Sequence, residues 1–172
     1  METILGSVET IRERPAEASP SAAAPPSALQ AHLGYWLRLV SNEVSHAFER
    51  ALRKRDISVA EWVALNQLAT ATGLTPATLA ATMGMTRGAI SKILDKLSAK
   101  QLISRSVSAL DNRVQILSLT AQGRRMLPQL THIADGNDEL FFAALSPDEQ
   151  AALRSLLRKV ARARQIVRIP VE

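Results

Sequence analysis

A helix, a very short turn and a second helix follow one another without slack in the middle of this chain. Thr75 and Pro76 predict a helix start, because a threonine side chain caps the first turn and proline fits there without losing a hydrogen bond. Gly84 predicts the end of that helix, and Thr86 caps the next one, which we expect to run to about Lys100. A turn this short holds two helices at a fixed angle, as a helix-turn-helix requires.

The second of these helices has two chemically different faces. At about 100° of rotation per residue, one half of its surface is apolar and the other half carries short polar groups and cations. A helix that reads the major groove needs this division, because one face must pack on the protein while the other hydrogen-bonds to base edges. A solvated surface is the alternative for the helix taken alone, but the tight turn before it favours DNA. The polar residues that we predict to contact DNA are Thr86, Arg87, Gly88, Ser91, Lys92 and Lys96.

A β-hairpin is predicted directly after that helix. Two segments with alternating side chains, 102–107 and 114–119, flank a polar tip. Residues 84–113 contain six basic and two acidic residues, a net charge of +4, which favours a polyanionic partner. We therefore expect this wing to contact phosphates or the minor groove, and the residues predicted to do so are Arg105, Asn112 and Arg113.

Asp111 lies two residues before Arg113 at the predicted tip. Its negative charge cannot contact DNA favourably, so we predict that it orients a nearby arginine and braces the wing. An ordinary Asp-Asn turn is the alternative. That turn accounts for Asp111 and Asn112 without DNA, but it does not account for Arg113.

Amphipathic helices are predicted on both sides of the winged segment. Apolar residues recur at helical spacing over 29–52, and a later helix should run over 120–145 with a bend near Gly136. A last helix begins at a capping box at Ser146 and ends before Pro170. The predicted fold is therefore mainly α with a small β-hairpin wing (α+β), a winged helix-turn-helix between terminal dimerisation helices.

We expect the chain to have four parts. Residues 1–27 are rich in Pro, Ala and Ser without an apolar period, which predicts a disordered tail. Residues 28–56 form an N-terminal dimerisation helix. The winged helix-turn-helix DNA-binding domain occupies 57–119 and begins with a helix from Ser58 to about residue 70. C-terminal dimerisation helices occupy 120–172.

The terminal helices carry more apolar surface than a single lobe can cover, which predicts a homodimer. Two-fold symmetry then predicts a pseudo-palindromic DNA site with half-sites about one helical turn apart. The last helix is also rich in cations from Arg154 to Arg168, for which a solvated face is favoured over additional DNA contacts. The residues expected at the seam between two copies are Phe141, Phe142, Leu145, Leu153, Leu156, Leu157, Val160 and Val167.

Other function classes lack the residues that they need. The chain has no cysteine, which excludes disulfides, thiol catalysis and thiolate zinc sites. Two of the three histidines, His32 and His46, lie about 21 Å apart along one predicted helix, too far to share a metal. There is no nucleophile elbow, glycine-rich phosphate loop or pair of catalytic carboxylates, so we expect no enzyme and no cofactor. The sequence lacks a signal peptide and an apolar run of about 18 residues, which favours the cytoplasm.

Residues 85–127 resemble the core of the MarR family of transcriptional regulators. The resemblance lies in Thr-Arg-Gly-Ala-Ile-Ser at 86–91, Asp111 and Arg113 of the wing, and Leu-Thr-x-x-Gly at 119–123. The helix order matches over 29–169. Asn112 departs from the family, in which a second basic residue is frequent at this position.

The resemblance implies a dimer whose first and last helices intertwine and place two recognition helices on successive major grooves. It also implies a pocket for a small aromatic or anionic effector between the dimer helices and the DNA-binding lobe. The expected function is a ligand-responsive repressor that binds a pseudo-palindromic operator as a homodimer. An activator of the same fold, or a helical module that binds no DNA, is the alternative. Candidates to line the effector pocket, with core packing as the alternative for the tryptophans, are His32, Tyr35, Trp36 and Trp62.

Overall fold

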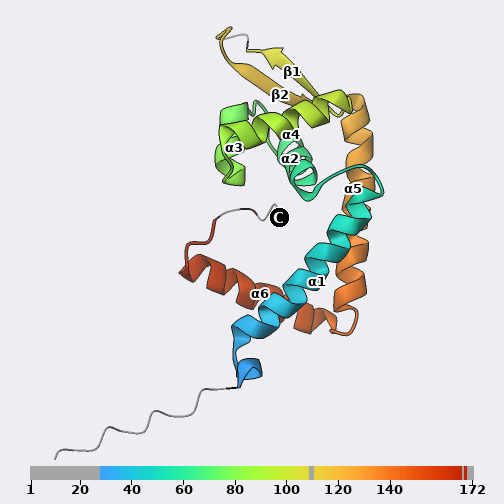
Figure 1. Cartoon of the computed structure of the whole chain (residues 1–172), viewed down its shortest axis with the longest axis vertical. Coiled ribbons are helices and arrows are strands. Elements are labelled where there is room, and N and C mark those ends of the chain that lie inside the picture. Colours follow the sequence, from blue (N-terminus) through green and yellow to red (C-terminus); the bar gives the residue numbers. More distant parts are fainter. Residues whose placement is uncertain (1–27, 109–110, 168, 170–172) are drawn as a thin grey trace, which may run out of the picture.

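The computed structural model describes residues 28–108, 111–167 and 169. Figure 1 shows a lobe built from α2, α3, α4 and the β1–β2 hairpin, with α1 and α5 leading away from it toward α6. This architecture confirms the predicted winged helix-turn-helix with helices on both sides. The elements are η1 (Leu29–Ala31), α1 (Leu33–Arg53), α2 (Val59–Thr70), α3 (Pro76–Met83), α4 (Arg87–Ala99), β1 (Ile103–Val107), β2 (Gln115–Leu119), α5 (Ala121–Phe142) and α6 (Pro147–Ala163).

Local sequence signals set the ends of the helices around the turn. Ser58 Oγ accepts the backbone N–H of Glu61 (3.2 Å), and the Glu61 carboxylate accepts that of Ser58 (2.7 Å), which begins α2. Thr75 and Thr78 begin α3 in the same reciprocal way. Gly84 ends α3 in the left-handed region (φ 63°), which glycine adopts at little cost. The predicted starts of α2 and α3 are confirmed.

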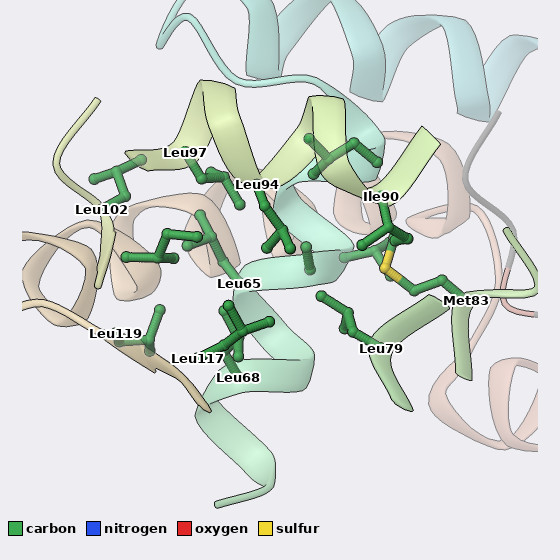
Figure 2. Close-up of a cluster of buried hydrophobic side chains, with 14 of the residues drawn as sticks. Leu65, Leu68, Leu79, Met83, Ile90, Leu94, Leu97, Leu102, Leu117 and Leu119 are labelled. Atoms are coloured by element: carbon green, nitrogen blue, oxygen red, sulfur yellow. The ribbon is translucent and has the colours of Figure 1, made fainter. Parts of the chain in front are cut away.

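One apolar core holds the lobe together. Figure 2 shows Leu65 of α2 between Leu94 of α4 and Leu117 of β2. Leu65 and Leu94 are almost completely buried, and each such side chain stabilises the fold by about 1.5–3 kcal/mol. Because the apolar face of α4 is buried in this core, its polar face points away from the protein.

The base of the hairpin is anchored to the start of α5. Thr120 donates its backbone N–H to the carbonyl of Leu102 (3.1 Å) and its hydroxyl to the carbonyl of Gln101 (2.6 Å). Gly123 then passes so close to the same strand that an added Cβ would lie 2.1 Å from the Leu102 carbonyl oxygen. A glycine is therefore required where α5 crosses the wing base.

The first helix is interrupted where the sequence predicted a continuous one. η1 ends at Ala31, and His32 is extended (φ −91°, ψ 125°) before α1 begins. The Trp36 indole N–H donates to the backbone carbonyl of Gln30 (2.8 Å). In a continuous helix this carbonyl would instead accept a backbone N–H one turn later. Apolar spacing could not reveal this competition between a side chain and the backbone.

α5 ends at Phe142, earlier than predicted, and is a continuous helix through Gly136, where a bend is predicted. α6 ends at Ala163, before Pro170 as predicted. The predicted end of α5 rests on apolar spacing, which continues after the helical hydrogen bonds have stopped. The predicted features that lie outside the described residues are the tail at 1–27, the tip residues 109–110, Arg168 and Pro170.

Candidate DNA-binding surface

The outward face of α4 is polar and accessible over its whole length. Thr86 Oγ1 accepts the backbone N–H of Ala89 (3.2 Å), so the predicted cap of α4 is confirmed. The apolar residues on the opposite side of the helix are buried. The exposed residues on the outward face, of which all but Asp95 are predicted from the sequence to contact DNA, are Arg87, Gly88, Ser91, Lys92, Asp95 and Lys96.

A groove of about 730 Å³ lies between α4, the N-terminus of α3 and the tip-side part of the hairpin. Three arginines, Arg87, Arg105 and Arg113, line it, and none of its lining residues is acidic. Its electrostatic character therefore suits phosphates. The residues that line the groove are Thr75, Pro76, Ala77, Arg87, Gly88, Ser91, Leu94, Arg105, Arg113, Val114 and Gln115.

The N-terminus of α3 is the part of this groove that the sequence analysis missed. In the sequence, Thr75 and Pro76 predict only a helix start, although a helix N-terminus presents backbone N–H groups that suit an anion. Conversely, Thr86, Lys92, Lys96 and Asn112 do not line the groove. The structure thus gathers five of the nine predicted DNA-contacting residues in one hollow and leaves the others on the surface around it.

Asp111 forms two hydrogen bonds with the backbone of the hairpin turn. Its carboxylate accepts the N–H of Arg113 (2.9 Å), and its carbonyl accepts the N–H of Val114 (3.0 Å). Among the described residues it forms no ion pair with an arginine. The expectation that Asp111 orients an arginine side chain is therefore corrected, because its carboxylate is engaged in the local turn.

The carboxylate that does hold a wing arginine belongs to α4. Asp95 Oδ1 lies 2.6 Å from Arg105 Nη2. Asp95 lies on the polar half of α4, but its position in the sequence gives no sign of this partner. Asp95 and Arg105 are 10 residues apart along the chain, in a helix and a strand, so no single periodicity in the sequence relates them.

The residues predicted to form an effector pocket are not brought together. Tyr35 and Trp36 pack edge to face on α1 with ring centroids 5.2 Å apart, and Trp36 is half exposed. Trp62 instead packs edge to face on Phe48 (4.9 Å) at the border of the core. Neither these residues nor His32 line the groove of about 730 Å³ beside α4 or the hollow of about 660 Å³ described next.

A different hollow, of about 660 Å³, lies between the C-terminal part of α2, strand β2 and residues 124–135 of α5. Apolar walls from Leu68, Leu117 and Leu127 are combined with the polar side chains of His132 and Asp135. It lies where the winged lobe meets α5. This combination of apolar walls and a few polar groups is typical of small-molecule sites.

α1 and α6 each carry exposed apolar side chains that no other described residue covers. α6 has no buried residue, although Leu153, Leu156, Leu157 and Val160 form a stripe along it. Leu33, Leu37 and Val40 of α1 are also exposed. In the part of the chain that the structure describes, no helix is long and apolar enough to cross a membrane, and no cluster of metal-ligating side chains is present.

Comparison with known proteins gives a consistent result. A sequence model described as MarR family matches residues 55–113. An uncharacterised HTH-type transcriptional regulator of Bacillus cereus is 31% identical over 143 residues, which cover 80% of this chain and 93% of that relative.

Solved structures share the fold. MarR from E. coli has a TM-score of 0.66 and 26% identity over 75% of this chain and 96% of that one. The transcriptional repressor CouR bound to a 23-mer DNA duplex has a TM-score of 0.70 and 28% identity, and the match covers 77% of this chain and 94% of CouR.

Proposed function

This chain belongs to the MarR family of transcriptional regulators, and from that membership we propose that two copies of it bind one operator in double-stranded DNA. In this proposal α4 enters the major groove and the wing contacts the flanking backbone. The residues assigned to DNA are Thr86, Arg87, Gly88, Ser91, Lys92, Lys96, Arg105, Asn112 and Arg113. No catalytic step is part of the proposal.

The division of α4 into a buried face and an exposed cationic face carries this proposal. Ile90 and Leu97 are completely buried, while Arg87, Ser91 and Lys92 are exposed. The apolar side anchors the helix, so the polar side projects as a rigid unit that fits a groove about 12 Å wide. The groove with its three arginines lies directly beside this face and offers cations to the phosphates.

A second copy of the chain is the proposed partner of α1 and α6. Leu156 and Val160 are 61% and 57% exposed on a helix that has no fully buried residue in the part of the chain that the structure describes. An amphipathic helix gains most of its stability from packing its apolar face. Self-association would cover this stripe, and two-fold symmetry would place the two α4 helices on half-sites about 34–36 Å apart.

We further propose a response to a small effector at the hollow between α2, β2 and α5. Its position at the joint between the winged lobe and α5 would let a ligand favour one spacing of the two α4 helices. Adding a phenolic acid such as 4-hydroxybenzoate should then weaken operator binding, which corresponds to a repressor released by its ligand. A Thr131→Leu variant, which narrows the hollow, should lose that response and keep DNA binding.

The test of DNA binding uses the full chain and a duplex from the region upstream of its own gene. Arg113→Ala should weaken binding and reduce the salt slope of log K by about 0.9, because one phosphate contact is lost. The matched control is Arg158→Ala, which removes the same charge from α6 at the far end of the molecule (Figure 1). Equal salt titrations for wild type and Arg113→Ala would contradict the assignment of the wing.

A further inference from the structure

Arg105 does not project freely from the wing. Its cross-strand partner is Leu117, which is buried in the core, and residues paired across a hairpin project from the same face. The Arg105 side chain therefore leaves β1 on the side of the protein body and extends over α4. There its guanidinium meets Asp95 at 2.6 Å.

Asp95 stands on the DNA-facing side of α4, one helical turn after Ser91. It is the acidic residue of that helix, and its side chain is 64% exposed, while that of Arg105 is 30% exposed. A carboxylate at this place repels phosphates, which is unfavourable on a DNA-binding face. The ion pair with Arg105 gives a physical reason for the presence of the carboxylate there.

From this geometry, and resting on the proposed function, we propose that Asp95 is a positioning residue that determines DNA specificity through Arg105. Held by Asp95, the guanidinium stays in the groove beside Arg87 and Arg113. The guanidinium then adds to the binding affinity only for a duplex that fits this groove. Released from Asp95, it can reach the phosphates of any duplex.

The strength of the pair is suited to this role. A largely exposed ion pair contributes little stability, typically less than about 1 kcal/mol, so a well-fitting duplex can displace it. Poorly fitting duplexes gain less from Arg105, because they do not displace Asp95 from its guanidinium. The acid thus lowers the affinity for unspecific DNA more than the affinity for the operator.

Asp95→Asn tests this inference, because it removes the charge and keeps the shape of the side chain. Binding is measured by fluorescence anisotropy over a series of salt concentrations, on a scrambled duplex and on the duplex upstream of the gene. We expect the affinity for the scrambled duplex to rise about fivefold. The salt slope on that duplex should steepen by about 0.9, the value for one additional phosphate contact. The affinity for the upstream duplex should change less, so the ratio of the two affinities falls.

Two variants separate the position of the charge from the net charge. Asp148→Asn removes the same charge from the exposed first turn of α6 and should bind both duplexes like wild type. Asp95→Glu retains the carboxylate and should keep the wild-type salt slope. Thermal unfolding of each variant reports whether the fold is intact.

The same substitution made in an Arg105→Gln background shows whether Asp95 acts through Arg105. There Asp95→Asn should leave the salt slope unchanged. The inference would be overturned if Asp95→Asn steepened the salt slope in the Arg105→Gln background. It would also be overturned if Asp95→Asn did not steepen the slope in the otherwise wild-type chain. A loss of binding confined to the upstream duplex would also overturn it, because the carboxylate would then read a base itself. If the wild-type chain binds neither duplex, the proposed function fails, whereas binding by wild type with no effect of Asp95→Asn removes only this inference.

Discussion

The carboxylate of Glu61 and the ammonium group of Lys100 form an ion pair of 2.9 Å in which the Glu61 side chain is only 4% exposed. Lys100 follows directly after α4, and Glu61 lies in the first turn of α2, where it also completes the cap with Ser58. The same ammonium group lies 3.5 Å from the Asp56 carboxylate in the α1–α2 turn. One lysine therefore fixes the C-terminal end of the DNA-facing helix to two other elements.

Lys100→Met should destabilise the protein by about 2–3 kcal/mol, because the buried Glu61 carboxylate loses its cation. Lys100 remains a quarter exposed, which places the expected loss at the lower end of values for buried pairs. Chemical denaturation of the full chain measures it. In a Glu61→Gln background, where the cap is retained without the charge, the same substitution should cost clearly less. Equal losses in both backgrounds would show that the ion pair does not matter.

Gly123→Ala should destabilise the fold by about 2–4 kcal/mol, because the new methyl group would overlap the Leu102 carbonyl, which the wing base cannot move aside. Gly136→Ala is the matched control in the same helix. An added Cβ meets nothing within 4 Å there, so this change should stabilise α5 by up to about 1 kcal/mol. Thermal unfolding of the two variants should therefore shift in opposite directions.

Gly88→Ala separates stability from DNA binding. An added Cβ at Gly88 meets nothing within 4 Å inside the protein, so alanine should stabilise α4 by up to about 1 kcal/mol. The same methyl group points outward from the first turn, where we expect the backbone to approach a phosphate. The melting temperature should rise while the affinity for the upstream duplex falls. A variant that is more stable and binds as tightly as wild type would remove Gly88 from the interface.

Leu156→Glu should prevent self-association, because it places a charge in the exposed apolar stripe of α6. Ser155→Glu adds the same charge to the neighbouring residue, which lines the cationic face of that helix, and should remain dimeric. Light scattering after size-exclusion chromatography gives the mass of each variant. A wild-type monomer, or a dimer that tolerates Leu156→Glu, would contradict the proposed seam.

Ser146 gives the start of α6 a dependence on pH. Its backbone N–H and its hydroxyl both donate to the Glu149 carboxylate, at 2.8 and 2.9 Å, and these hydrogen bonds lower the pKa of Glu149. A group whose pKa is lowered by folding adds stability above its unfolded pKa and loses it as the pH falls through the folded value. The difference in stability between wild type and Glu149→Gln should therefore be present at neutral pH and shrink in acid. Denaturation curves over an acid pH series measure it.

Much of the lobe could be predicted from neighbouring residues alone. Thr75, Gly84 and Thr86 mark helix ends through hydrogen bonds and backbone angles within one turn, so their signals are local. The two faces of α4 follow from its periodicity, since an apolar stripe must be buried somewhere. The motif ending in Gly123 was visible as a family resemblance, although its steric reason needed the position of Leu102.

Contacts between distant elements decided the rest. The packing of α3, α4 and the hairpin pairs Arg105 with Asp95, whereas Asp111 forms no ion pair with an arginine among the described residues. The same packing places Thr75 in the groove that the three arginines line. Helix starts and the apolar side of each helix follow from the amino-acid order alone, because residues within a few positions of one another set them. The charges that meet and the surfaces that stay uncovered follow from how the elements pack, because they depend on distances between elements that no local pattern encodes.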